Sequence, residues 1–226
     1  METTGQTMIT IHHLNNSRSQ RVLWLLEELG LPYEVRHYKR GKNLRAPAEL
    51  KSVDPLGKAP ILQENGLTLT ETGAIVDYIV ETHARGRLTP EPGSPAHWQC
   101  RHFVHHAEGT AMPPLFLKLV TIEMPKRAPF FARGILKSAM GTLDRALVAP
   151  EIAANLAHWE RALQASGWFS GADFSVADIM MSFPVEAGAS RVDYTRHPAL
   201  RDFLARIHAR PAYRAALEKG GPYAYA

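Results

Sequence analysis

The spacing of apolar residues along this chain changes once, near residue 84, and this change limits the possible folds more than any other feature. Residues 8–83 mix two-residue and helical repeats, whereas no convincing strand pattern follows residue 94. Between them, residues 84–94 hold two prolines and two glycines and are typical of a linker. We therefore expect a mixed domain over 8–83, a linker over 84–94 and an all-helical domain over 95–226.

The first domain shows strand and helix patterns in the order β-α-β, then α, then β-β-α. The expected strands cover 8–14, 33–38, 60–63 and 67–69, and the expected helices cover 22–29, 46–50 and a segment that begins at 71. Gly30 is positioned to end the first helix, and Asn65-Gly66 indicates a tight hairpin. A helix between the first two strands predicts parallel pairing, while the hairpin predicts antiparallel pairing. The simplest packing is a four-stranded mixed sheet flanked by helices.

The second domain is expected to contain helices over 95–121, 128–148, 150–166, 175–187 and 198–218. Ser175 and Asp178 have the spacing of a capping box in front of an apolar run. We interpret this pair as the structural start of a buried helix.

Composition narrows the class of protein. The chain has 226 residues, 45% of them hydrophobic and 21% charged, which is typical of a globular protein. Its formal charge of +4 is scattered, so we expect no nucleic-acid partner. We also expect no membrane span, since no apolar run approaches about 18–20 residues, and no secretory signal. Cys100 stands alone, which excludes an intrachain disulfide and favours a reducing, cytoplasmic location.

Two pairs of adjacent histidines, His12-His13 and His105-His106, invite a metal interpretation. Neighbours in sequence do not share one face of a strand or helix, so neither pair forms a site alone. We therefore expect no metal site.

Small polar residues fill the expected turn over 14–21, between the first strand and the first helix. Asn16 or Ser17 could simply cap the helix. The same turn could instead hold an anion, including a thiolate, because the helix N-terminus carries a partial positive charge.

Two further motifs allow both a structural and a functional interpretation. In Gly57-Lys58-Ala59-Pro60, the proline opens a strand beside a hairpin and could follow a cis or a trans peptide bond. Glu71 and Thr72 begin a helix, where they could cap it or bind the ammonium and carboxylate groups of a ligand.

Taken in this order, the motifs resemble cytosolic glutathione S-transferases, in a branch shared by bacteria and fungi. The resemblance covers roughly residues 8–218. It implies a thioredoxin-like N-terminal domain, a helical C-terminal domain, a homodimer and a role in detoxification. It also implies glutathione as co-substrate, a small electrophile or peroxide as second substrate, and no tightly bound cofactor.

The resemblance also implies which residues hold glutathione: Arg45, Lys58, Ala59, Pro60, Glu71 and Thr72. The Ala-Pro bond would be cis, and its backbone would pair with the cysteinyl part. Glu71 and Thr72 would hold the γ-glutamyl end. Lys58 would reach the ligand, and Arg45 would meet the glycyl carboxylate, with Lys42 as a weaker candidate.

Relatives place a Tyr, Ser or Cys in the first turn to hydrogen-bond the glutathione sulfur. In this sequence the serine position of some classes falls on Asn16, and Ser17 follows it. We expect Ser17 to be the catalytic donor, with Asn16 as the alternative. A free thiol has a pKa of about 8.5. Lowering this pKa by about two requires the thiolate to be stabilised by roughly 2.7 kcal/mol. One hydroxyl and a helix N-terminus can supply this amount.

The electrophile is expected to lie against residues of the helical half: His105, Glu108, Met112 and Phe116. Two alternatives to conjugation remain open. One is a glutathione-dependent peroxidase or disulfide reductase that uses the same thiolate. The other is a non-catalytic binding or regulatory protein with the same fold.

Overall fold

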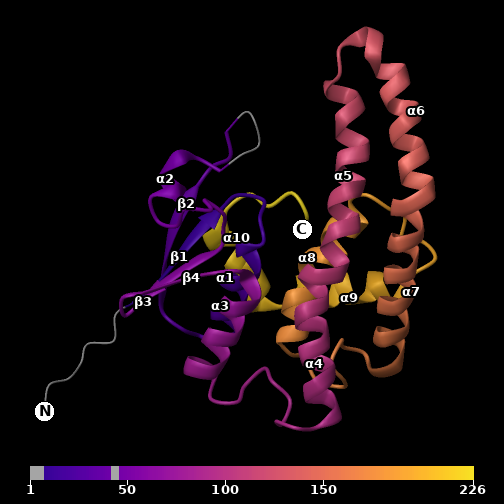
Figure 1. Cartoon of the computed structure of the whole chain (residues 1–226). Helices are drawn as coiled ribbons and strands as arrows, with labels where there is room; N and C mark the ends of the chain where they lie inside the picture. Colours follow the sequence, from indigo (N-terminus) through magenta and orange to yellow (C-terminus); the bar gives the residue numbers. More distant parts are fainter. Residues whose placement is uncertain (1–7, 42–45) are drawn as a thin grey trace, which may run out of the picture. The chain divides into compact units, whose positions relative to one another are not determined.

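The computed structural model describes residues 8–41 and 46–226, which form two compact units (Figure 1). The first unit combines the described residues up to Glu91 with Arg206–Ala226, and the second is Pro92–Ala205. This division differs from the expected domains, because the last segment joins the first unit. There α10 (Pro211–Gly220) packs on α1 (Ser19–Leu29) and buries Tyr213 and Ala216.

A four-stranded mixed sheet lies at the centre of the first unit, in the order β2-β1-β3-β4. Its strands are β1 (Ile9–Leu14), β2 (Tyr33–Tyr38), β3 (Ile61–Glu64) and β4 (Leu67–Thr70). The β1–β2 pair is parallel and the other two pairs are antiparallel. The predicted sheet, its pairing directions and the thioredoxin-like order of elements are therefore confirmed.

Helix α1 packs against β1, α3 (Thr72–Ile79) and α10, so it is buried almost throughout. Trp24 and Leu25 are 1% and 0% exposed. The helix ends at Gly30, whose φ of 66° is the left-handed conformation that a glycine C-cap provides. The short α2 (Ala48–Lys51) precedes β3.

Apart from an isolated bridge in the loop before α8, the second unit, which is described in full, is helical. The expected helix over 95–121 consists of α4 (Pro95–His106), a π-helical turn at Ala107–Ala111 and α5 (Met112–Arg127). The remaining helices are α6 (Arg133–Leu143), α7 (Ala149–Ser166), α8 (Val176–Ala189) and α9 (Pro198–Ala209). Helices α5 and α6 lie side by side (Figure 1).

The expected helix over 198–218 is two helices, α9 and α10. The break falls at Arg210, because Pro211 has no N–H to donate and holds the preceding residue in an extended conformation.

The predicted capping box at Ser175 and Asp178 is confirmed at the start of α8. Of the fourteen residues of α8, all but Ala189 are buried, so this helix forms the core of the second unit. None of the helices in the described ranges is long and apolar enough to cross a membrane.

Candidate active site

The register of the sheet brings three separate motifs to one end of the first unit. His12 of β1 lies opposite Ile61 of β3, and Ile61 lies opposite Thr70 of β4. Since β3 runs antiparallel to both neighbours, the turn after β1, the residues before β3 and those after β4 share one end of the sheet. Asn16-Ser17, Ala59-Pro60 and Glu71-Thr72 are therefore collected there, although up to about sixty residues separate them in sequence.

Ser17 lies inside the turn rather than on its surface, with 5% of its area exposed. Its Oγ is 2.7 Å from Ser19 Oγ and accepts the Ser19 N–H at 3.3 Å. Ser19 Oγ in turn lies 2.9 Å from Nδ1 of His13. The candidate hydroxyl thus belongs to a buried chain of three polar side chains.

Burial lowers the pKa of His13 to about 4, and the neighbouring His37 acts in the same direction, so the His13 ring is neutral at pH 7. The carbonyl of Gly220 hydrogen-bonds this ring and can only accept. The arrangement that satisfies both partners leaves Nδ1 to accept from the Ser19 hydroxyl. Ser19 Oγ then accepts from the Ser17 hydroxyl, which is directed into the protein.

Asn16 has a different environment. It is half-buried, and its φ of 51° lies in the left-handed region that asparagine tolerates better than most residues. Its Oδ1 accepts the backbone N–H of Ala224 at 2.8 Å. This bond uses the carbonyl end of the amide and none of its N–H groups. The N-cap of α1 by its bounds is Arg18, whose side chain makes no capping hydrogen bond. Ser17, one residue earlier, nevertheless accepts the N–H of Ser19, the first residue of the helix, so the capping interpretation holds for Ser17 and not for Asn16.

The peptide bond between Ala59 and Pro60 is cis, as the resemblance implied. Pro60 is buried, Ala59 is half-buried and Lys58 is exposed. Arg45 and Lys42, the expected partners of the glycyl carboxylate, lie outside the described residues.

Glu71 and Thr72 stand where β4 turns into α3. Glu71 is the N-cap of α3, but its side chain makes no capping hydrogen bond and is exposed. Its φ of 67° and ψ of 123° are costly for a residue with a Cβ, by about 1–3 kcal/mol, and such residues cluster at ligand sites. Thr72 is 3% exposed and opens the helix. The carboxylate thus remains available to a ligand.

The residues expected to contact the electrophile all lie in the second unit, on the helical path from α4 to α5. His105 and Phe116 are exposed, Glu108 is half-buried and Met112 is buried. The π-helical turn at Ala107–Ala111 falls inside this path and changes the number of residues per turn. The spacing argument assumed a regular α-helix, so the shared face of these residues stays a prediction.

Known proteins of one family are similar in sequence to this chain over 94% of its length. Residues 6–81 match the family model of the glutathione S-transferase N-terminal domain. The chain is 32% identical to glutathione S-transferase 3 of Schizosaccharomyces pombe, over 94% of this chain and 88% of that protein. It is 30% identical to glutathione S-transferase 1 of Saccharomyces cerevisiae, over 94% and 95% of the two chains.

Solved glutathione S-transferase structures superimpose on this chain over almost its whole length. A glutathione S-transferase from Actinobacillus pleuropneumoniae superimposes with a TM-score of 0.78 at 30% identity, covering 96% of this chain and 95% of that one. A sphingomonad glutathione S-transferase in complex with glutathione superimposes with a TM-score of 0.70 at 25% identity, covering 94% and 98%.

Proposed function

Because the chain belongs to the glutathione S-transferase family, we propose that it binds glutathione at the shared end of its sheet and activates the thiol as a thiolate for attack on small electrophiles. One observation carries this proposal. The register of β1, β3 and β4 collects the turn at Asn16, the Ala59-Pro60 step and the Glu71-Thr72 pair at one end of the sheet.

Each part of the peptide has a matching group at that end. The exposed carboxylate of Glu71 takes the γ-glutamyl ammonium, and Thr72 with the N-terminus of α3 takes the carboxylate beside it. The backbone at Ala59 and Pro60 pairs with the cysteinyl part, as in relatives. Lys58 supplies positive charge beside the ligand at that end, and Arg45, which lies outside the described residues, is assigned to the glycyl carboxylate from the family resemblance alone.

The sulfur contact is assigned to the amide of Asn16, with Ser17 as the alternative. The hydroxyl of Ser17 is engaged by Ser19, so it must first break a buried hydrogen bond before it can donate to sulfur. The Asn16 amide is anchored through its oxygen and keeps its N–H groups for a ligand. A hydrogen bond to a charged acceptor contributes about 1.5–3 kcal/mol, and the N-terminus of α1 adds about 0.3–1 kcal/mol. Together they cover the roughly 2.7 kcal/mol of a two-unit shift in thiol pKa.

Reduction of a peroxide or disulfide would use the same thiolate, so it is the second candidate activity. Cys100 is buried, and burial raises the pKa of its thiol, which makes it a poor nucleophile. In such a reaction the electrons come from two glutathione molecules, which leave as the disulfide. The homodimeric state and the cytoplasmic location stay predictions.

The test is a calorimetric titration with glutathione, combined with thiolate absorbance of the bound peptide as a function of pH. It compares wild type with Asn16→Ala, Ser17→Ala and Glu71→Gln, with the exposed Ser52→Ala as the matched control. We expect Glu71→Gln to weaken binding about tenfold or more, as loss of a charge-assisted contact does. Asn16→Ala should raise the pKa of the bound thiol with little change in affinity.

A thiol pKa that moves only in Ser17→Ala would transfer the donor role to Ser17. An unshifted thiol pKa in bound wild type would remove thiolate activation from the proposal. Absence of glutathione binding would favour the non-catalytic interpretation.

A further inference from the structure

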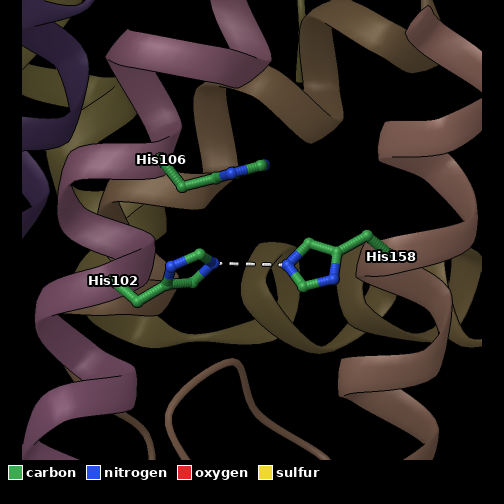
Figure 2. A group of neighbouring side chains, drawn as sticks. All are labelled: His102, His106 and His158. Carbon is green, nitrogen blue, oxygen red and sulfur yellow. Dashed lines mark hydrogen bonds between the residues drawn. The ribbon is translucent and has the colours of Figure 1, made fainter.

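Three histidines gather on the helical unit, and none of them is among the residues assigned to glutathione. His102 and His106 lie one turn apart on α4, and His158 faces them from α7 (Figure 2). One nitrogen from each ring lies within 4.8 Å of the other two. The three ring centroids form a nearly equilateral triangle, with sides of 5.4, 5.4 and 5.5 Å. The rings therefore surround a common point.

The nitrogen spacing of one pair, His102 and His158, matches that of two ligands on one metal ion. Nε2 of His102 lies 3.3 Å from Nε2 of His158. Two nitrogens bound tetrahedrally to zinc at about 2.0–2.1 Å are about 3.4 Å apart. Binding by this pair needs only a tautomer shift, in which the hydrogen shared between the two Nε2 atoms is replaced by one on an Nδ1 atom.

Neighbouring side chains contact two of the rings. Phe103 is fully buried and stacks on His158 with ring centroids 5.3 Å apart. Nε2 of His106 accepts the indole N–H of Trp159 at 2.9 Å, so the lone pair is on Nε2 and the hydrogen of the neutral ring is on Nδ1. Asn155 also hydrogen-bonds the His106 ring. A second partner of this kind commonly orients a metal-binding histidine.

We propose that His102, His106 and His158 bind a divalent transition-metal cation, with Zn²⁺ as the preferred ion and a fourth position open to water. Three imidazole ligands and no thiolate or carboxylate in the cluster favour Zn²⁺, Ni²⁺ or Cu²⁺ over Mg²⁺ or Ca²⁺. The exposed His102 gives the ion a route from solvent. The ion would link α4 to α7 within the second unit.

Trp159 gives this proposal an internal reporter. The lone pair on Nε2 of His106 cannot accept the indole N–H and bind a cation at the same time. Metal binding therefore releases the Trp159 hydrogen bond and changes the environment of a side chain that is 1% exposed. Substitution by phenylalanine removes this signal and the competing donor, but it leaves all three ligands.

The experiment uses the untagged full chain, freed of metal with a chelator and titrated with Zn²⁺ by calorimetry and with Co²⁺ by visible absorbance. We expect one ion per chain, a tetrahedral Co²⁺ spectrum without a thiolate band, and a change in tryptophan emission that Trp159→Phe abolishes. His102→Asn and His158→Asn should each weaken binding at least about 100-fold, because loss of a group that only orients a ligand already costs up to about that much and loss of the ligand itself costs more. His97→Asn, on the same helix but outside the cluster, is the matched control and should bind as wild type does.

Equal affinity in His158→Asn and wild type would overturn the proposal, as would the absence of saturable binding. His102 is exposed, so His102→Asn keeps the test valid if His158→Asn does not fold. A thiolate band in the Co²⁺ spectrum would move the ion to Cys100 and also overturn it. None of these outcomes depends on glutathione binding, which we assign to residues of the first unit.

Discussion

Replacement of Asp178 by alanine should destabilise the protein more than any other single change in the second unit that we consider. The carboxylate is fully buried, and its hydrogen bonds include three from the loop and cap in front of α8. Oδ1 accepts the backbone N–H of Phe169 at 2.8 Å, and Oδ2 accepts the backbone N–H and the hydroxyl of Ser175 at 2.9 and 3.3 Å. One side chain thus fixes the start of α8 and the loop that leads to it.

The expected loss of stability follows from the polar groups that Asp178→Ala leaves without an acceptor. In Asp178→Ala two buried backbone N–H groups lose their acceptor, and each unsatisfied group costs about 1–3 kcal/mol. The Ser175 hydroxyl keeps Ser170 as a partner at 2.7 Å, so its loss is small. Removing a buried charge returns part of its desolvation cost. We expect a net loss of about 3–4 kcal/mol, a large fraction of the roughly 5–15 kcal/mol that typically stabilises a folded domain.

The assay is urea unfolding followed by circular dichroism and tryptophan emission, with Asp178→Asn and Ser175→Ala in parallel. Asp178→Asn keeps one carbonyl oxygen as acceptor and should lose about 1–3 kcal/mol. Ser175→Ala removes the bond that its Oγ accepts from the N–H of Ala177, at a typical cap cost of about 1 kcal/mol. A loss below about 1 kcal/mol in Asp178→Ala would refute the argument that this carboxylate holds the start of α8. Glutathione affinity should stay unchanged, since the residues assigned to it lie in the first unit.

Three further predictions concern stability. Burial lowers the pKa values of His13 and His106 to about 4, so between about pH 6.5 and 4 the folded state binds fewer protons than the unfolded state. The free energy of unfolding should therefore fall by about 3 kcal/mol per histidine as the pH drops through this range. A urea midpoint that stays constant over this range would contradict the prediction. Glu28→Ala removes a carboxylate whose two oxygens each accept a hydrogen bond from the Arg210 guanidinium, so the free energy of unfolding should fall by about 1–3 kcal/mol. A double-mutant cycle with Arg210→Ala that gives no coupling energy would argue against this value. Gly220→Ala places a Cβ against Oε1 of Gln20 and Cδ1 of Leu23 on α1, so overpacking should cost about 1–3 kcal/mol in thermal unfolding; an unchanged melting temperature would show that these neighbours can give way at little cost.

The sheet could be predicted because its signals are local. The hairpin at Asn65-Gly66 has positive φ at both residues, 49° and 78°, which is the type I′ geometry that this dipeptide favours. The apolar spacing of α1 is likewise readable from eight consecutive positions. The place of residues 206–226 could not be read in this way, because an amphipathic helix shows that it buries one face but not which element covers it.

The candidate site was predictable in its residue types and order, but not in its hydrogen bonds. The position of Ser17 in the sequence does not reveal the hydrogen bonds that link it through Ser19 to His13. These bonds exist only because β1 and the first turn of α1 fold together. The histidine cluster shows the same limit. The spacing of His102 and His106 at i and i+4 places both rings on one helix face and can be read from the sequence, whereas His158 joins them only through the packing of the second unit.

The partners of the first turn indicate why the C-terminal segment belongs to the first unit. The carbonyl of Gly220 hydrogen-bonds His13, and the N–H of Ala224 binds the oxygen of Asn16. The first contact orders the chain that engages the Ser17 hydroxyl, and the second fixes the amide of Asn16 by its oxygen. A donor held in this way needs little reorganisation when negative charge develops on a nearby sulfur, and such preorganised donors are the effective ones. The turn that we assign to thiol activation is therefore built from both ends of the sequence, about 200 residues apart.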